Sequence, residues 1–274
     1  MLSKRQQAIQ TMQRHEQMLQ CPLCKEPMTV AETGEVQCFN RHSYDIAKQG
    51  YVYLLTKPMQ SMYSKELFEA RHDVIASGLY DEVQQAVAKL LPKGRVLDTG
   101  CGEGSHLVRM LENRPDCTGV GIDIAKEAIV AAAKFATGPI WCVGDLANSP
   151  YAAGSFSSIL NFLSPANYEE FKRLLQHDGV VIKVVPEEGY LKELRAQAFA
   201  NSEKETYSND QTVQRFEENF QHVEKYRVTY TKPLQAALVP KLLQMTPMGW
   251  HIDNKEAVQL PQITIDVSIL VGRV

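Results

Sequence analysis

The feature that most constrains the fold of this 274-residue chain is a group of three cysteines and one histidine near its N-terminus. Cys21 and Cys24 form a CxxC pair, and after thirteen further residues Cys38 and His42 form a CxxxH pair. A CxxC turn brings two thiolates within reach of one metal ion, and a hairpin between the pairs returns the other two ligands. This Cys3His set predicts a closed, tetrahedral, structural Zn2+ site.

The alternatives to zinc are free cysteines at a domain edge or a redox-active CxxC pair. A redox dithiol does not require a third cysteine and a histidine at the return spacing, so zinc is favoured. A segment of about 35 residues also buries too little apolar surface to fold alone, so it needs a bound structural metal ion. The remaining cysteines, Cys101, Cys117 and Cys142, are scattered further along the chain and are interpreted as packing residues.

Changes in composition divide the chain into four segments. Residues 1–20 are rich in Gln, Met and charge, lack Gly and Pro, and predict a helical extension. Residues 21–57 are turn-rich and form the expected zinc-binding module, in which MTV, ETGE and VQCF predict a small hairpin. Residues 58–93 begin as a polar linker and continue as helices broken at Gly78. Residues 94–274 form the main domain.

Residues 94–274 alternate strand and helix patterns, which predicts a mostly parallel sheet with helices on both faces. The strand segments RVLDTG, TGVGID and PIWCVGD alternate with the helical segments SHLVRMLENR and AKEAIVAAAKFA. HVEKYRVTYTKPL and ITIDVSILVG predict a last pair of strands around a helix, which is typical of S-adenosylmethionine methyltransferases. The expected fold class is therefore α/β, a Rossmann-like methyltransferase domain with a small N-terminal zinc-binding module.

A glycine-rich loop, VLDTGCGEG at residues 96–104, ends the first expected strand of this domain and opens a helix. Gly100, Gly102 and Gly104 let the backbone turn sharply and leave room for a ligand against it. The spacing is G-x-G-x-G and differs from the G-x-G-x-x-G of dinucleotide-binding proteins. Asp98 would repel a pyrophosphate but suits the cationic sulfonium or amino group of S-adenosylmethionine.

Two further acids follow the next two expected strands. Asp123 closes TGVGID, where a carboxylate can bond both ribose hydroxyls, and Asp145 closes WCVGD, where it can reach the adenine amine. The carboxyl ends of parallel strands meet at one edge, where doubly wound sheets bind ligands. Acids at three successive strand ends together with the glycine loop predict an S-adenosylmethionine site.

The overall composition excludes several classes of protein and predicts a cytoplasmic one. Hydrophobic residues make up 44% and charged residues 22% of the chain, unlike a disordered tail or a coiled-coil rod. No apolar run is long enough for a membrane span, and the polar N-terminus lacks the apolar core of a signal peptide. The formal net charge of −3 provides no global basic field for nucleic acid.

Aromatic and cationic residues are interleaved around the expected zinc site. They are Phe39, Arg41, Tyr44, Lys48, Tyr51 and Tyr53. Such a mixture suits unpaired RNA bases, which stack on the rings while cations contact phosphate. The alternative is that Tyr51 and Tyr53 belong to a strand core and that the cations are simply solvated. Residues 1–60 contain seven Lys/Arg and five Asp/Glu, an excess too small to indicate RNA binding by itself.

With these motifs in place, the chain resembles the bacterial RlmA family of 23S rRNA (guanine-N1)-methyltransferases. The resemblance covers nearly the whole length after residue 20 and rests on CPLC, CxxxH, AKQGYVYLL, FEARHDVIASGLY, VLDTGCGEG and LLQMTP. A zinc module fused ahead of a methyltransferase domain is more specific than the glycine loop alone. KQGYVYLL together with FEAR is similar to the branch found in Gram-positive bacteria.

The resemblance implies a reaction, partners and further cofactor contacts. It implies that the zinc module helps to recognise a 23S rRNA hairpin and that a homodimer holds this RNA in its cleft. The family's S-adenosylmethionine contacts carry over onto Tyr80, His106, Leu107 and Tyr190. Considered without the family, Tyr80 and Tyr190 are equally well core aromatics, and His106 a solvent-facing residue at a helix N-terminus.

The loop NFLSPANYEE, after the fourth strand of the main domain, normally faces the target base in this fold. Asn161 and Ser164 can hydrogen-bond the guanine edge there, and Asn161 is the candidate catalytic residue. The loop lacks the NPPY-type motif of exocyclic-amine methylases, in agreement with a ring-nitrogen target. No Asp or Glu in it stands out as a general base.

Two other functions are open to a chain with this pattern. A small-molecule S-adenosylmethionine methyltransferase would share the fold and the glycine loop but has little reason to carry a zinc module. A non-catalytic RNA-binding factor would retain the fold but has little reason to keep an intact glycine loop and strand-end acids. The sequence therefore favours transfer of a methyl group to N1 of a guanine in a 23S rRNA hairpin loop.

Overall fold

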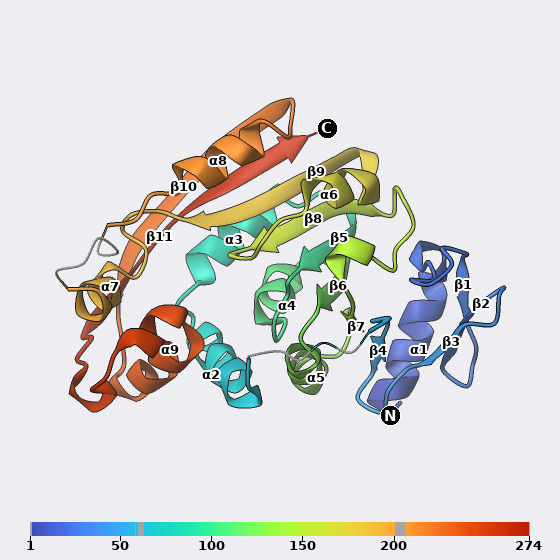
Figure 1. Cartoon of the computed structure of the whole chain (residues 1–274), viewed down its shortest axis with the longest axis horizontal. Helices are drawn as coiled ribbons and strands as arrows, with labels where there is room; N and C mark the ends of the chain where they lie inside the picture. The colour runs from blue at the N-terminus through green and yellow to red at the C-terminus, as the bar shows by residue number, and fades with distance from the viewer. Residues whose placement is uncertain (1, 58, 60–62, 201–205, 274) are drawn as a thin grey trace.

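The structure is a computed structural model that describes residues 2–57, 59, 63–200 and 206–273. It contains a three-stranded sheet of order β1-β2-β3 and an eight-stranded sheet of order β10-β11-β9-β8-β5-β6-β7-β4 (Figure 1). The expected linker after residue 57 lies in part at positions outside the described residues. Figure 1 shows the small sheet at one end of the molecule, beyond β4, and β10 at the other end.

The N-terminal extension is helical, as expected. It consists of α1 (Lys4–Arg14) and the short 3-10 helix η1 (Glu16–Met18). Ser3 begins α1 with a capping box, because its side chain accepts a hydrogen bond from the backbone of Gln6 and the Gln6 side chain accepts one from the backbone of Ser3. This cap fixes the start of a helix whose intrinsic stability is marginal at eleven residues.

The three short strands that follow form the zinc ribbon, defined here as residues 19–46. They are β1 (Met28–Val30), β2 (Glu35–Cys38) and β3 (Ser43–Asp45), and neighbours pair antiparallel. The MTV–VQCF hairpin predicted from the sequence is thus present. Its register aligns Met28 with Cys38.

The centre of the large sheet consists of parallel strands separated by helices, as the strand–helix alternation predicts. The parallel strands are β5 (Gly94–Thr99), β6 (Cys117–Asp123), β7 (Ile140–Val143), β8 (Phe156–Phe162) and β9 (Leu175–Pro186). β5 lies between β6 and β8, so the chain order reverses at β5. A ligand site is expected outside the carboxyl ends of strands at such a switch point.

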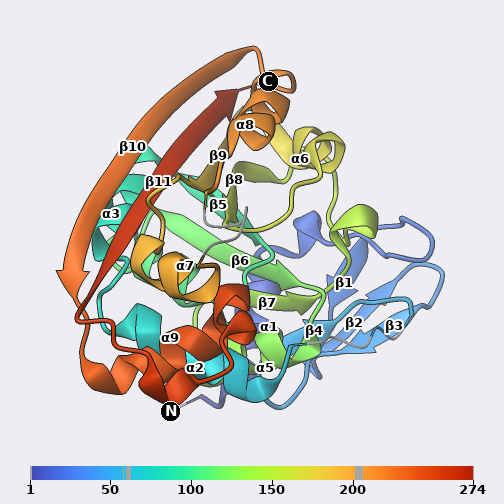
Figure 2. The same cartoon turned by 60° about the vertical axis from the view of Figure 1, so that its left-hand side comes forward.

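The two long C-terminal strands complete the sheet. β11 (Gln262–Arg273) pairs antiparallel with β9 on one side and with β10 (His222–Pro233) on the other. Figure 2 shows this pair as the long curved edge of the molecule. The arrangement confirms the expected terminal strand pair beside a parallel sheet.

One strand lies in a different place from the one expected. β4 (Tyr51–Tyr53) falls within residues 21–57, the segment expected to form the zinc-binding module, but it pairs parallel with β7 at the edge of the large sheet. Tyr51 and Val52 are buried there, and a bridge between Ile46 and Val52 links this edge to the ribbon. β7 gives this segment a parallel partner, and Tyr51 and Val52 pack into the cores on the two faces of the sheet.

Helices cover both faces of the large sheet. They are α2 (Lys65–Ala76), α3 (Asp81–Leu90), α4 (Ser105–Leu111), α5 (Lys126–Phe135), α6 (Tyr168–Leu174), α7 (Lys192–Ala198), α8 (Asp210–Glu217) and α9 (Val239–Met245), with the 3-10 helices η2 (Leu146–Asn148), η4 (Ala236–Leu238), η5 (Pro247–His251) and η6 (Lys255–Ala257). The expected break between α2 and α3 occurs at Gly78, which has φ +84°. Gly tolerates this left-handed conformation without steric cost.

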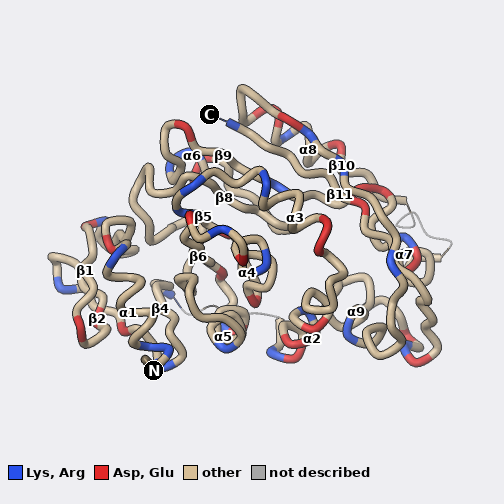
Figure 3. The backbone as a smooth tube through the Cα atoms, turned by 180° about the vertical axis from the view of Figure 1, so that it is seen from behind, with Lys and Arg blue, Asp and Glu red and all other residues tan. Residues whose placement is uncertain are grey.

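Two apolar cores lie on opposite faces of the sheet. Val96 of β5 packs in a core with α2 to α5, α7 and α9, whereas its neighbour Leu97 packs in a core with α1, α6, α8 and the zinc ribbon. Successive strand residues point to opposite faces, so one strand contributes side chains to both cores. Among the described residues no helix has the length and apolar character needed to cross a membrane. Figure 3 shows Lys and Arg interspersed with Asp and Glu along the chain.

Candidate zinc and cofactor sites

The zinc ribbon brings together the four ligands expected from the sequence. The ligand atoms of Cys21, Cys24, Cys38 and His42 all lie within 4.8 Å of one another. Nδ1 of His42 is 3.4 Å from Sγ of Cys21 and 3.5 Å from Sγ of Cys38, and the Sγ atoms of Cys24 and Cys38 are 3.6 Å apart. Ligands about 2.1–2.3 Å from one tetrahedral ion have roughly these separations. The cluster therefore fits Zn2+ and offers Nδ1 of the histidine to it.

Two tight turns aim these ligands. The backbone N–H of Lys25 donates to the carbonyl of Cys21, and that of Arg41 donates to the carbonyl of Cys38. Lys25 and Arg41 both have φ +63°, a left-handed conformation that closes each turn around its pair of ligands. A hydrogen bond from the backbone of Glu26 lowers the pKa of Cys24 to about 6, which favours the thiolate that binds metal.

The glycine loop between β5 and α4 has the conformation that its sequence requires. Gly100, Gly102 and Gly104 have φ of +68°, +59° and +76°. A Cβ on Gly104 would lie 2.3 Å from the ring of Trp141, so this glycine permits the close packing of α4 on β7. Gly100 and Gly102 line a cavity, whereas Gly104 does not.

This cavity, called here the cofactor cavity, has a volume of about 450 Å3 and lies at the carboxyl edge of β5, β6 and β7. Asp123 and Asp145 line it, as the strand-end pattern predicts. Asp123 accepts hydrogen bonds from the backbone N–H groups of Gly102 (2.9 Å) and Ala125 (2.8 Å), which tie the glycine loop to the end of β6. Asp145 accepts one from the backbone of Ala147 at 2.8 Å.

Asp98 lies behind the glycine loop as a buried acid with an unused acceptor. Its side chain is 1% exposed, and its Oδ1 has no hydrogen-bond partner among the described residues. Burial raises the pKa of Asp98 to about 7, although the cation of Arg71 opposes this shift. A positive amino group supplied by a ligand would satisfy this acceptor. The loop and its three acids therefore fit S-adenosylmethionine, which carries such a group beside its sulfonium.

The remaining walls of the cofactor cavity come from segments that the sequence analysis did not assign to it. They are contributed by α2 and by the region of α9 and η5, and include Phe68, Arg71, Met245, Pro247 and Trp250. Arg71 pairs with Glu103 of the glycine loop, with 3.0 Å between Nε and Oε2. The FEAR motif thus places a cation against the glycine loop. A charged residue among the apolar residues of this helix was the sequence signal that could have assigned Arg71 to the cavity.

A second cavity adjoins the first and is called here the aromatic cavity. Its volume is about 370 Å3, and Tyr80, His106 and Tyr190, three of the residues carried over from the family, line it. The hydroxyls of Tyr80 and Tyr190 are 2.7 Å apart. The two cavities share Leu163, Ser164 and three other lining residues. Ligands bound in the two cavities would therefore lie next to each other.

His106 is held as a neutral ring in this wall. It stacks on Phe162, with 3.9 Å between centroids, and its Nδ1 is 3.0 Å from Nε2 of Gln84. Burial, followed by the charge of Arg71, holds the pKa of His106 well below its usual range. His106 is therefore a buried cavity residue rather than a solvent-facing one. Leu107 is fully buried in the core and lines neither cavity.

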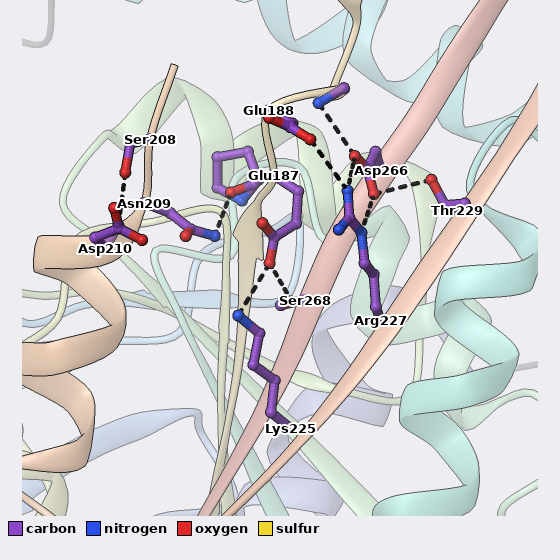
Figure 4. A network of polar contacts seen from close by, with 12 residues as sticks. Glu187, Glu188, Ser208, Asn209, Asp210, Lys225, Arg227, Thr229, Asp266 and Ser268 are labelled. Atoms are coloured by element: carbon purple, nitrogen blue, oxygen red, sulfur yellow. Dashed lines mark hydrogen bonds and ion pairs between the residues drawn. The ribbon is translucent and has the colours of Figure 1, made fainter.

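The loop that carries Tyr190 is anchored by a polar network between the end of β9 and the middle of β10 and β11 (Figure 4). Asp266, 3% exposed, accepts two hydrogen bonds from Arg227 at 2.8 and 2.9 Å and one from the backbone of Gly189 at 3.1 Å. The bidentate Arg227 contact holds the pKa of Asp266 below its usual value. The network fixes the backbone immediately before Tyr190.

Asn161 lies beneath the cavities and lines neither of them. Its side chain is fully buried, and its Nδ2 contacts Thr99 Oγ1, Ser164 Oγ and the carbonyl of Pro165 at 2.7 to 3.0 Å. Its Oδ1 accepts a hydrogen bond from Lys183. Asn161 is thus placed to hold neighbouring groups rather than to touch a ligand, whereas Ser164 lines both cavities.

Lys183 of β9 is a polar wall residue that the sequence analysis missed. Its side chain lines the aromatic cavity and is 4% exposed. The signal was a single lysine inside the apolar run GVVIKVV, where a charged residue needs an explanation.

Comparison with known proteins agrees with both sites. A family profile described as "RlmA, N-terminal" matches residues 19–65, and one described as "Methyltransferase domain" matches residues 90–232. YxjB of Bacillus subtilis, which bears the provisional name 23S rRNA (guanine-N(1)-)-methyltransferase, is 39% identical over 93% of this chain and 96% of its own. The chain belongs to the RlmA family of methyltransferases.

Other matches of this RlmA-family chain agree. The 23S rRNA (guanine(748)-N(1))-methyltransferase of Streptomyces fradiae is 28% identical over 93% of this chain and 96% of its own. Both relatives come from Gram-positive genera, as the KQGYVYLL and FEAR segments predict. A solved chain from the Haloferax volcanii Trm112 methyltransferase activator complex covers 78% of this chain with TM-score 0.50 and 14% identity, a likeness of fold alone. S-adenosylmethionine and Zn2+ are accordingly the cofactor and the metal.

Proposed function

We propose that the protein transfers the methyl group of S-adenosylmethionine to N1 of a guanine in a hairpin loop of 23S rRNA. The observation that carries this proposal is the joining of an RlmA-type zinc ribbon to a methyltransferase domain in one chain, matched over 93% of its length by relatives named for this reaction. The two adjoining cavities give the reaction a place, because a base in one lies beside a methyl donor in the other.

The cofactor cavity is proposed to hold S-adenosylmethionine through groups at three strand ends. Gly100 and Gly102 give the methionine part access to the backbone, and Asp98 accepts from its amino group. Asp123 holds the ribose hydroxyls, and Asp145 faces the adenine amine. When bound, the cofactor supplies the electrophilic methyl carbon, and the chain's own groups set its direction.

The aromatic cavity is proposed to hold the target base. N1 lies on the Watson–Crick edge of guanine, so the base must be unpaired and turned out of its stack before transfer. Tyr80, Tyr190 and His106 were expected to contact S-adenosylmethionine, but they line this second cavity and not the cofactor cavity, so we assign them to the base. Their rings offer flat surfaces and hydrogen-bonding groups without a charge that would repel the methyl donor. Holding N1 in line with the methyl carbon supplies much of the acceleration through proximity.

The zinc ribbon is proposed to recognise the rRNA. Phe39 and Leu23, at the two metal-binding turns, are 90% and 56% exposed, which is unusual for large apolar side chains. Exposed rings of this kind stack on unpaired bases at about 1–3 kcal/mol each. Phe39→Ala is expected to raise the KM for RNA at unchanged S-adenosylmethionine affinity, with the exposed Tyr226→Ala on β10 as the matched control.

The proposal is tested by incubating the protein with methyl-labelled S-adenosylmethionine and unmodified 23S rRNA and mapping the label. Label on N1 of one loop guanine is expected. Label on a small metabolite with none on RNA would establish a small-molecule methyltransferase instead. Tight RNA binding without any transfer would establish a non-catalytic RNA-binding factor.

The resemblance to the family also supports a homodimer that works in the cytoplasm on ribosomal RNA. Light scattering of the zinc-loaded protein is expected to give about twice the mass of the 30.8 kDa chain. A monomer at micromolar concentration that still methylates rRNA at full rate would contradict the dimer.

A further inference from the structure

The aromatic cavity contains one primary amine, that of Lys183, among the residues that line it. Lys183 lies near the carboxyl end of β9, directly beside Asn161 of β8 in the register of the two strands. Its side chain is 4% exposed and opens onto the cavity next to Ser164, where the two cavities meet. The amine is therefore close to the place where a base and a methyl donor would come together.

The hydrogen bonds of Lys183 match a neutral amine. Its Nζ donates to Oδ1 of Asn161 and to the carbonyl of Ser164, at 3.0 Å in the second case. A neutral primary amine has two hydrogens and one lone pair, so these two acceptors occupy both donors. Contacts of the Asn161 amide nitrogen with Thr99 and Pro165 fix its Oδ1 as the acceptor, and the lone pair of Lys183 remains for the cavity.

Burial of Lys183 also opposes its protonation. Burial lowers the pKa of Lys183 to about 8, and no carboxylate among the described residues forms an ion pair with it. Arg71 of α2 adds a cation to the same cavity, and its partner Glu103 faces the arginine. His106 of α4 is neutral. The other titratable groups lining the cavity are the hydroxyls of Tyr80, Tyr190 and Tyr207.

We propose that the neutral amine of Lys183 is the general base that removes the N1 proton of the target guanine. Asn161 and the main chain of Ser164 act as positioning groups, because they hold the two amine hydrogens and turn the lone pair toward the base. This assignment rests on the proposed function. It gives Asn161 a supporting role. It also names a general base in a cavity that no Asp or Glu lines.

The step balances with groups already named. The N1–H bond of guanine breaks, and its proton moves to the Nζ lone pair of Lys183, which becomes an ammonium ion. The electron pair left on N1 forms the bond to the methyl carbon of S-adenosylmethionine. The carbon–sulfur bond breaks with its electrons on sulfur, and S-adenosylhomocysteine leaves. The ammonium ion of Lys183 then returns its proton to solvent.

The test compares pH–rate profiles of the wild type, Lys183→Met and Lys183→Arg at saturating S-adenosylmethionine and rRNA. The wild-type kcat is expected to rise about tenfold per pH unit in the acid range and to level off at or below about pH 8, as Lys183 loses its proton. Both variants are expected to lose this inflection and to fall about 10²- to 10⁴-fold in kcat near neutral pH, because neither carries a titrating amine.

Two measurements separate chemistry from folding. Zinc content and S-adenosylmethionine affinity of both variants are expected to match the wild type, since Lys183 is no zinc ligand and does not itself line the cofactor cavity. Lys192→Met, at the exposed first residue of α7, is the control and is expected to keep the wild-type profile. Asn161→Ala is expected to lower kcat and shift the inflection, because the amine loses its partner.

The outcomes separate a failure of the Lys183 assignment from a failure of the proposed function. Wild-type labelling of guanine N1 together with an unaltered profile in Lys183→Met overturns the role of Lys183 alone. A wild-type rate that falls as the pH rises through 8 also overturns it, because the ammonium form would then be the active one. A wild type that labels no guanine N1 overturns the proposed function and this assignment with it.

Discussion

The zinc ribbon and the cofactor cavity are both polar sites, but they are assembled over very different distances along the chain. The four zinc ligands lie between Cys21 and His42, on two turns of one small sheet. The walls of the cofactor cavity extend from Tyr63 to Trp250 and come from five or more separate elements. The first site is a local product of sequence spacing, whereas the second exists only when the whole sheet has formed.

The two regions also differ in what holds them together. The cofactor cavity lies on a sheet with an apolar core on each face, so its walls remain in place without a ligand. The ribbon consists of three strands of three or four residues, and its buried apolar residues Leu19, Met28, Val30, Val36 and Ile46 pack into only one of these cores. We therefore expect zinc to be part of the ribbon's fold, and the cofactor to bind a fold that already exists.

The largest expected effect follows from removing the metal. Cys24→Ser is expected to reduce zinc from about one ion per chain to none and to unfold the ribbon, since structural zinc contributes on the order of 10 kcal/mol. The large sheet should persist and still bind S-adenosylmethionine. Metal analysis, together with hydrogen exchange of residues 21–45, measures both effects.

Cys117→Ser is the matched control, because Cys117 starts β6 far from the metal cluster. It should retain full zinc and a protected ribbon. Protected amides in the ribbon of a zinc-free Cys24→Ser protein would show that packing alone holds this region, and the contrast between the two regions would fail.

The second prediction concerns the cofactor cavity. Asp123→Ala removes the acceptor of the Gly102 N–H and the proposed partner of the ribose, so S-adenosylmethionine affinity is expected to fall about 10- to 100-fold. Titration calorimetry measures this, and Asp116→Ala, beside the opposite end of the same strand, should leave the affinity unchanged. Wild-type affinity in an Asp123→Ala protein with an intact ribbon would contradict binding of the ribose at the end of β6.

This difference in assembly explains how much of each site could be predicted. The zinc ligands were predicted completely, because a CxxC turn and a hairpin are set by neighbours in sequence. The glycine loop and the acids at strand ends were also predicted, since parallel strands bring their carboxyl ends to one edge. Arg71 and Trp250 were not assigned to the cavity. The charge of Arg71 on α2 was a signal, but the packing of α2 and η5 over that edge depends on contacts distant in sequence.

Three placements depended on contacts distant in sequence. The YVY segment of β4 joins the large sheet instead of the ribbon, because β7 offers an unpaired edge. Asn161 occurs at the end of a strand that normally faces the target, but its side chain turns inward to Thr99 and Lys183. Lys183 was interpreted only as part of a buried strand. Its functional role could not be predicted, because it depends on the cavity that Lys183 lines together with Tyr80 and Tyr190.

The third prediction uses Asp98, the buried acid behind the glycine loop. The pKa of Asp98 is about 7 in the folded protein and near 3.8 in an unfolded one. The folded state therefore holds a proton that the unfolded state releases between about pH 4 and 7, and ionisation of Asp98 lowers stability as the pH rises through this window. Without cofactor, Asp98→Asn is expected to raise Tm by several degrees at pH 8 and little at pH 4.

The same substitution should weaken cofactor binding, because the amide cannot pair with the amino group as an anion does. In the wild type, affinity is expected to fall as the pH drops below about 7, when Asp98 takes up a proton, and Asp98→Asn should lack this dependence. Asp178→Asn, at a fully exposed acid, is the control for both scans. A lower Tm for Asp98→Asn at pH 8 would show that the carboxylate is satisfied without a ligand.

The smallest expected effect concerns the outer wall of the cofactor cavity. Trp250 is 46% exposed, lies 6.2 Å from the ring of Tyr63 and lines the cavity from η5. Because its ring is already half solvated, Trp250→Ala is expected to weaken S-adenosylmethionine binding only about 3- to 10-fold, close to 1 kcal/mol. Tyr226→Ala, another exposed aromatic but on β10 away from the cavity, should change nothing. A loss of 100-fold or more in Trp250→Ala would mean that this wall is assembled by the ligand, and the cofactor cavity would then resemble the zinc ribbon in depending on what it binds.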